Sequence, residues 1–99
     1  MTSYFKQTVF RSEKLRRAVA ELPCKNCGRE GCTQAAHRNE GKGMAMKTSD
    51  ALLAALCTDC HRELDQGGDM TRSEKRELFD RACIKTYQAL VESGKLVLS

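Results

Sequence analysis

Two Cys-x-x-Cys pairs, Cys24/Cys27 and Cys57/Cys60, constrain this 99-residue chain more than any other feature. Each such turn places two sulfurs within reach of one ion, and zinc binds four thiolates tetrahedrally at about 2.3 Å. A single pair would be ambiguous, whereas two pairs in one short chain favour a structural zinc site. The sequence therefore predicts a metal core over residues 24–66.

The length suits one domain, which we place at residues 1–99. A domain of this size buries only a modest core, and aromatic residues make up 5% of the chain, with no tryptophan. Structural zinc contributes on the order of 10 kcal/mol to the folding of small finger peptides. We therefore expect zinc to hold together a region that side-chain burial alone would leave loose.

Residues 1–10 lack the apolar run of a secretory signal, and no later segment has the length of a membrane span. These absences favour a cytoplasmic protein with no membrane partner. In that compartment cysteine clusters indicate metal or redox chemistry, and disulfides are rare. A disulfide framework among the six cysteines is the alternative that export would permit.

The N-terminal third predicts a helix over residues 12–22. Ser12 can cap this helix, Leu15 and Val19 recur at helical spacing, and Pro23 ends it. Basic residues gather in and just before the helix: Arg11, Lys14, Arg16 and Arg17. In a chain of net charge +4, such a cluster either contacts nucleic-acid phosphates or forms a solvated helix face.

The middle of the chain predicts short strands and a helix. Residues 33–37 form a candidate strand, and residues 38–48 form a polar, glycine-bearing loop. The apolar run 51–57 is too short for periodicity to separate helix from strand. Its position before the second cysteine pair favours a buried strand. A helix follows from Cys60 and ends at a Gly-Gly pair.

The C-terminal third predicts a long amphipathic helix over residues 71–93. Thr71 and Glu74 form a capping box, and Gly94 supplies the stop. The apolar face of this helix serves either as the domain core or as the surface of a homodimer. Residues 95–99 form a tail with the character of an edge strand.

Two stretches, AAHRN at residues 35–39 and LCTDCH at residues 56–61, resemble the HNH nucleases, also called the ββα-metal or His-Me finger family. More narrowly, the chain is similar to small prophage nucleases of the YbcO type. The shared features are the segment from Leu15 to Ala18, the Ala36-His37 pair, the step from Lys47 to Asp50 and the stretch from Cys57 to Asp65. The resemblance covers residues 15–66.

This resemblance implies an α+β fold with a treble-clef or ββα-metal core, in which zinc stabilises a short β-hairpin and a helix. The helices over 12–22 and 71–93 would flank that core. The resemblance also implies a metal-dependent endonuclease that hydrolyses phosphodiester bonds in DNA. Its place would be phage or prophage recombination or DNA processing, inside a bacterial host cell.

In this family a histidine general base activates water for attack on the phosphodiester, beside one divalent cation. His37 matches the base, and either Asp50 or Asn39 matches the group that orients it. The alternatives are that His37 completes the zinc site or packs in the core, and that Asp50 is an N-cap for a helix over 51–57.

His61 and Asp65 match the ligands of the catalytic cation, because residues at i and i+4 share one helical face. An imidazole and a carboxylate suit Mg²⁺, Mn²⁺, Zn²⁺ or Ni²⁺. The alternative is an ordinary exposed pair. With His37 as base, we expect the two imidazoles to converge on one phosphate-sized gap. Many HNH enzymes carry Asp before the base histidine, where this chain has Ala36 and so lacks one ligand.

DNA is the expected partner of the basic residues. The candidate phosphate contacts are Arg11, Lys14, Arg16, Arg17, Arg38, Lys42 and Lys47. Such contacts position a protein on DNA without reading sequence. Nothing in the chain is a recognisable reader of base edges, so we expect little sequence specificity.

Cys32 and Cys83 are the remaining cysteines. Cys32 can replace Cys27 as the partner of Cys24, because the narrower family uses a wider first pair. The two-residue spacing gives the lower-strain knuckle and favours Cys27. Cys83 falls on the apolar face of the last helix and is most simply a core residue.

Two other functions fit parts of the sequence. A catalytically inactive zinc module that binds DNA or a phage DNA-metabolism protein would use the same four cysteines. The run from Cys57 to His61 also spells the haem-attachment pattern C-x-x-C-H. We reject haem because its attachment needs export and leaves the first cysteine pair unexplained.

Overall fold

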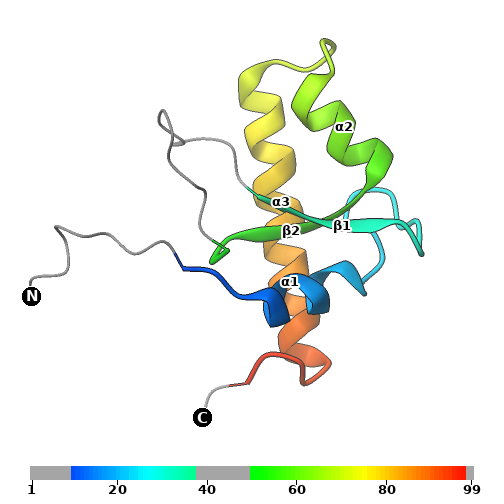
Figure 1. The fold of residues 1–99 in the computed structure, drawn as a ribbon. Helices are drawn as coiled ribbons and strands as arrows, with labels where there is room; N and C mark the ends of the chain where they lie inside the picture. Colours follow the sequence, from blue (N-terminus) through cyan, green and yellow to red (C-terminus); the bar gives the residue numbers. More distant parts are fainter. Residues whose placement is uncertain (1–9, 38–49, 98–99) are drawn as a thin grey trace, which may run out of the picture.

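The computed structural model describes residues 10–37 and 50–97 of the chain. Their elements are α1 (Glu13–Ala20), β1 (Thr33–His37), β2 (Leu53–Cys57), α2 (Thr58–Gln66) and α3 (Arg72–Glu92). The strands pair antiparallel in a two-stranded sheet, from Thr33 opposite Cys57 to His37 opposite Leu53. The fold is therefore α+β, as expected. Figure 1 shows the hairpin crossing the long helix α3, with α2 above it and α1 below it in this view.

The two flanking helices begin at the capping residues that the sequence indicates. The Ser12 hydroxyl accepts the backbone N–H of Leu15 at 3.1 Å at the start of α1. Thr71 and Glu74 form the expected capping box at the start of α3. After α3, Gly94 adopts φ +81°, the left-handed conformation that ends many helices. Within the described part of the chain, no helix is long and apolar enough to cross a membrane.

The apolar run before the second cysteine pair is a strand, as its position suggests. The alternative in which Asp50 caps a helix over 51–57 is wrong, because β2 occupies most of this run and all of its residues are buried. Helix α2 begins directly after β2, earlier than the expected start at Cys60, with Cys57 as its N-cap. In the C-terminal tail, residues 95–97 are irregular and do not form the expected strand.

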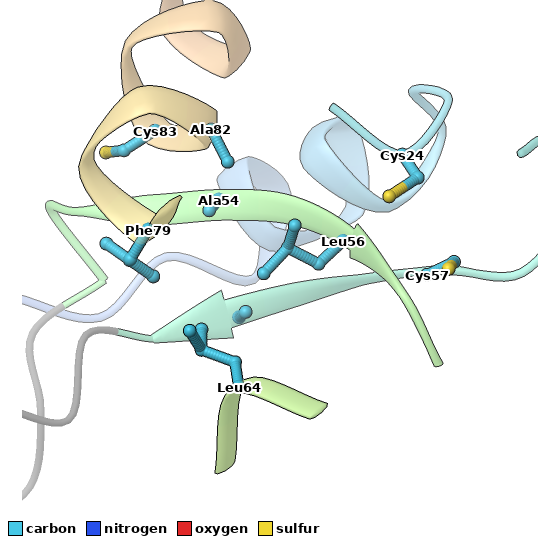
Figure 2. Packing of buried hydrophobic residues seen from close by; sticks show 9 residues of the cluster. Cys24, Ala54, Leu56, Cys57, Leu64, Phe79, Ala82 and Cys83 are labelled. Carbon is cyan, nitrogen blue, oxygen red and sulfur yellow. The ribbon is translucent and has the colours of Figure 1, made fainter. Parts of the chain in front are cut away.

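The hairpin carries a buried cluster on each of its two faces. The α2-side cluster joins the hairpin to α2 and to the first half of α3: Cys24, Ala36, Ala54, Leu56, Cys57, Leu64, Phe79, Ala82 and Cys83. The α1-side cluster joins it to α1 and the second half of α3: Val19, Leu22, Leu53, Ala55 and Leu90. Figure 2 shows Leu56, Leu64 and Phe79 turned toward one another in the α2-side cluster.

This arrangement explains why β2 contains no polar residue. Successive strand residues point to opposite faces of a sheet, and both faces of the hairpin are covered by helices. Three alanines of the strands, Ala36, Ala54 and Ala55, are fully buried. The apolar face of α3 therefore lies in the core of the chain, which is one of the two roles expected for it.

Candidate metal centre and active site

The four cysteines of the two Cys-x-x-Cys pairs meet at one point. Their sulfur atoms all lie within 4.8 Å of one another. Cys24 and Cys27 lie on the turn after Pro23, Cys57 ends β2, and Cys60 lies in the first turn of α2. An ion bound by these sulfurs would join the turn that follows α1 to the junction between β2 and α2.

Both cysteine turns have the hydrogen bonds that favour thiolate ligands. The backbone N–H groups of Asn26 and Cys27 each donate to Cys24 Sγ at 3.4 Å. In the second turn the N–H of Cys60 donates to Cys57 Sγ at 3.5 Å. The Asn26 amide adds a bond from Nδ2 to Cys60 Sγ at 3.3 Å. Donors of this kind surround a metal site and orient its ligands.

The thiols are too close together to ionise independently. Burial opposes ionisation of Cys24, but backbone hydrogen bonds from Cys27, Cys57 and Asn26 outweigh it and lower the pKa of Cys24 to about 6. Burial and then the neighbouring thiols raise the pKa of Cys60 to about 12. Four thiolates this close need a divalent cation between them, and a tetrahedral set of sulfur ligands suits zinc. The four cysteines therefore fit a structural zinc ion.

The other two cysteines lie outside this group. Cys32 packs against the α2-side cluster, and its sulfur lies 3.8 Å from Arg29 Nη1. Its backbone oxygen accepts the N–H of Thr58 at 3.1 Å. Cys83 is buried in the core, as expected. The set of four sulfurs thus contains Cys27 and not Cys32.

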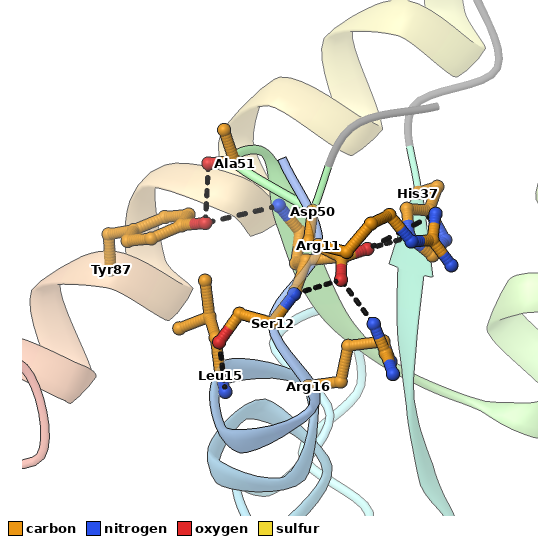
Figure 3. A network of polar contacts seen from close by, with 9 residues as sticks. Arg11, Ser12, Leu15, Arg16, His37, Asp50, Ala51 and Tyr87 are labelled. Carbon is orange, nitrogen blue, oxygen red and sulfur yellow. Dashed lines mark hydrogen bonds and ion pairs between the residues drawn. The ribbon is translucent and has the colours of Figure 1, made fainter. Parts of the chain in front are cut away.

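A second polar site joins His37 to Asp50. His37 is the last residue of β1, and its Nε2 lies 2.6 Å from Asp50 Oδ1. The Asp50 side chain is fully buried, whereas the His37 side chain is 28% exposed. Figure 3 shows Asp50 between His37 on one side and the start of α1 on the other. One nitrogen of a partly exposed imidazole is therefore held by an inaccessible carboxylate.

The start of α1 supplies the other partners of Asp50. The backbone N–H of Ser12 donates to Oδ2 at 2.7 Å. Arg16 Nη1 forms an ion pair with the same oxygen, and Arg11 Nη1 lies 3.8 Å from Oδ1. Burial alone would raise the pKa of Asp50. The hydrogen bonds from His37, Ser12 and Arg16 and the charge of Arg11 outweigh burial and lower this pKa to about 2. Asp50 is therefore ionised at neutral pH.

His61 belongs to a third polar group, on α2. Its Nδ1 lies 2.8 Å from Gln34 Oε1, and its Nε2 lies 3.4 Å from Asp65 Oδ2. Since an amide oxygen only accepts, Nδ1 donates to Gln34, and the neutral ring then has its lone pair on Nε2, the nitrogen beside Asp65. His61 and Asp65 thus share one face of α2, as their spacing predicts. Gln34 is the residue that sequence reasoning missed.

The structure holds the two histidines in separate hydrogen-bonded pairs. Gln34 and His37 are three positions apart on β1, and an odd separation places their side chains on opposite faces of the hairpin. Ala36 belongs to the α2-side cluster, and Gln34, two positions before it, points to the same face of the hairpin. His61 contacts Gln34 and therefore lies on this face, whereas His37 lies on the other. The expected convergence of both imidazoles on one gap is therefore not present in this arrangement.

The candidate DNA contacts differ in their surroundings. Lys14 is exposed. Arg17, 75% exposed, pairs with Glu13 at 2.8 Å on the outer face of α1. Arg11 and Arg16 instead lie against Asp50. Three further candidates and the alternative orienting residue lie outside the described residues: Arg38, Lys42, Lys47 and Asn39.

Comparisons with protein-family models, with curated proteins and with solved structures each returned no match for this chain.

Proposed function

We propose that this protein is a metal-dependent endonuclease of the HNH type that hydrolyses phosphodiester bonds in DNA. The observation that carries the proposal is the pair formed by His37 and the buried, ionised Asp50. An imidazole held by a carboxylate on one nitrogen is the usual arrangement of a histidine general base. His37 is the last residue of β1, in a hairpin followed by α2, and the four cysteines come together at the junction of β2 and α2.

Asp50 determines which nitrogen of His37 would act. The carboxylate only accepts hydrogen bonds, so the neutral imidazole carries its proton on Nε2 and donates it to Asp50. The lone pair then lies on Nδ1, and this nitrogen accepts the proton of the attacking water. The charge that develops on the ring is balanced by the ionised carboxylate.

His61 and Asp65 would hold the catalytic cation. Helix α2 follows β2 without a loop and packs through Leu64 on the hairpin face that carries Ala36. His61 and Asp65 thus lie on the helix that covers this face, whereas His37 ends β1 on the other face. A bound divalent cation supplies a Lewis acid that stabilises the charge on the phosphate during hydrolysis. Gln34 would fix the His61 ring with Nε2 directed toward the ion.

The test of this proposal is nicking of supercoiled plasmid by the zinc-loaded protein with Mg²⁺, Mn²⁺ or Ni²⁺. Loss of a general base typically lowers the rate by about 10²- to 10⁴-fold, so we expect at least the lower figure for His37→Ala. His61→Ala should raise the cation concentration needed for half-maximal nicking. Glu77→Gln, on the exposed outer face of α3, is the control. The proposal fails if no cation supports nicking, or if nicking survives His37→Ala.

A second candidate is a non-enzymatic zinc module that binds DNA or a phage DNA-metabolism protein. Ala36 favours it, because this residue contributes no ligand to the face where His61 and Asp65 lie. The separation of the two histidines favours it as well. This module would bind one zinc and no second cation, so metal counting under Mn²⁺ titration separates it from the nuclease.

A further inference from the structure

Arg16 differs from the other candidate phosphate contacts on α1, because its side chain is partly buried against a carboxylate. Its guanidinium pairs with Asp50 Oδ2, and its side chain is only 32% exposed. The neighbouring Arg17 is 75% exposed and pairs with Glu13, which is 67% exposed. Two adjacent arginines on one helix thus have different surroundings, and only one of them contacts the carboxylate that holds His37.

We propose that Arg16 is a positioning residue for His37, which acts by fixing the orientation of the Asp50 carboxylate. The inference rests on the proposed function of His37 as general base. In this role Arg16 touches neither the substrate nor the cation. It determines which nitrogen of the imidazole carries the proton.

The two carboxylate oxygens of Asp50 bond to different partners. Oδ2 accepts the Ser12 N–H at 2.7 Å and pairs with Arg16, and both donors come from the start of α1. Oδ1 lies 2.6 Å from His37 Nε2. Because two donors hold Oδ2, the carboxylate cannot rotate without breaking both, and Oδ1 remains directed at the imidazole.

Arg16 also keeps Asp50 in the form that the imidazole needs. A fully buried carboxylate tends to take up a proton unless charges and donors compensate for the lost water. A protonated carboxyl could donate to His37 Nε2 and so favour the opposite tautomer. The charge of Arg11 acts in the same direction as Arg16 but from 3.8 Å. Arg16 is therefore the stronger of the two.

A consequence is that the first turn of α1 and the residues just before it hold Asp50 in place. The Asp50 N–H donates to the backbone oxygen of Phe10 at 2.8 Å, and the Asp50 carboxylate accepts from the backbone N–H of Ser12 and from the Arg16 guanidinium. The segment from Phe10 to Arg16 thus contacts Asp50 through both backbone and side chains. The outer face of α1, with Lys14 and Arg17, is left to contact DNA.

The test uses ¹⁵N-histidine NMR of the zinc-loaded full chain, whose only histidines are His37 and His61. Their resonances are assigned with His61→Gln. In the wild type we expect the His37 ring to be protonated at Nε2 when neutral. In Arg16→Gln we expect a mixture of the two tautomers. Nicking should fall by about 10- to 100-fold in kcat, as is usual when a supporting partner is lost, with KM changed less than about threefold.

Arg81→Gln is the matched control, because Arg81 pairs with Glu77 on the exposed side of α3 and has no part in the site. It should leave the His37 resonances and kcat as in the wild type. Arg17→Gln serves only as the comparison for DNA binding and should lower the slope of log Kd for DNA against log salt by about 1. Arg16→Lys keeps the charge but lacks the planar fork, so it should restore part of kcat and part of the Nε2–H tautomer. Should Arg16→Gln fail to fold, Arg16→Lys carries the test, and wild-type tautomers in that variant overturn the proposal.

The NMR measurement does not depend on catalysis. If the protein cuts no DNA, the proposed function fails while the effect of Arg16 on the His37 tautomer is still measured. If Arg16→Gln keeps the wild-type tautomer and weakens DNA binding as Arg17→Gln does, Arg16 is an ordinary phosphate contact and the inference is wrong.

Discussion

The Thr86 hydroxyl accepts the backbone N–H of Ala55 at 2.9 Å, which joins the middle of α3 to the outer edge of β2. The same hydroxyl donates to the Ala82 backbone oxygen at 2.7 Å. At the same edge, the Ala55 backbone oxygen accepts the N–H of Lys25, from the first cysteine turn, at 2.8 Å. The buried polar groups that β2 leaves unpaired at this edge are thus satisfied by α3 and by the first cysteine turn.

Replacing Thr86 by valine should destabilise the protein by about 1–3 kcal/mol, the cost of leaving a buried donor unpaired. The valine has nearly the same shape, so the Ala55 N–H loses its partner while packing is kept. Thr86→Ser retains the hydroxyl and should lose only the contribution of one methyl group, about 1 kcal/mol. Urea unfolding of the zinc-loaded proteins measures both. A Thr86→Val variant as stable as the wild type would show that Ala55 finds another partner.

The strand β2 shows where sequence reasoning reaches its limit. Alanine and leucine are strong helix formers, and the run 51–57 contains little else before Cys57. The run is a strand because its edge bonds to α3 and its two faces are both covered. Those partners are distant in the chain, so no local pattern reveals them. Only the position of this run directly before the second cysteine pair indicated a strand.

Removing zinc should unfold the hairpin, because the four cysteines connect its strand end to the first turn. One zinc per chain is expected for the wild type and for Cys32→Ser, whose sulfur lies outside the group of four. Cys27→Ser should bind zinc much more weakly and lose most of the roughly 10 kcal/mol that such a site can contribute. Metal analysis after gel filtration, with circular dichroism before and after chelation, tests this. Equal zinc loss in both variants would place Cys32 among the ligands.

The cysteine site was predictable because its spacing is local. Two residues between cysteines fix the geometry of each turn, whatever the rest of the chain does. The partners of the histidines were not predictable in the same way. Gln34 reaches His61 only because β1 pairs with β2 in one register and α2 folds back over the hairpin. Arg16 reaches Asp50 only because α1 packs beside the start of β2.

Tyr87 should stabilise the protein at neutral pH and lose that effect in alkali. Its hydroxyl donates to the Ala51 backbone oxygen at 2.6 Å and accepts the N–H of Leu53 at 3.3 Å. Burial is the largest cause and raises the pKa of Tyr87. The nearby Cys83 and Asp50 raise this pKa as well, whereas the hydrogen bond from Leu53 lowers it. Tyr87→Phe should cost about 1–2 kcal/mol at pH 7.

The sign of the pH effect follows from the raised pKa. The unfolded tyrosine ionises near pH 10, before the folded one does, so the wild-type free energy of unfolding falls as pH rises above that value. Tyr87→Phe has no such group, and the difference between the two proteins should shrink between pH 9 and pH 11. Other titrating groups are common to both and cancel. A constant difference over this range would mean that the folded pKa of Tyr87 is not raised.

Gln34 should control how tightly His61 and Asp65 bind the catalytic cation proposed above. The amide oxygen fixes the His61 ring through Nδ1, so that Nε2 is available beside Asp65. Loss of such a supporting partner typically weakens metal binding about 10- to 100-fold. We therefore expect Gln34→Ala to raise the dissociation constant for Mn²⁺ by that factor, measured by electron paramagnetic resonance on the zinc-loaded protein.

The matched control is Gln88→Ala, which removes an amide that pairs with Glu92 at 3.2 Å on the exposed side of α3. This variant should bind Mn²⁺ as the wild type does. His61→Ala should abolish the site, whereas zinc held by the four cysteines should be unchanged in all three variants because Gln34 and His61 are not among those ligands. If Gln34→Ala binds Mn²⁺ with wild-type affinity, the His61 ring is held by packing against α2 and the hairpin, and the amide has no part in the site.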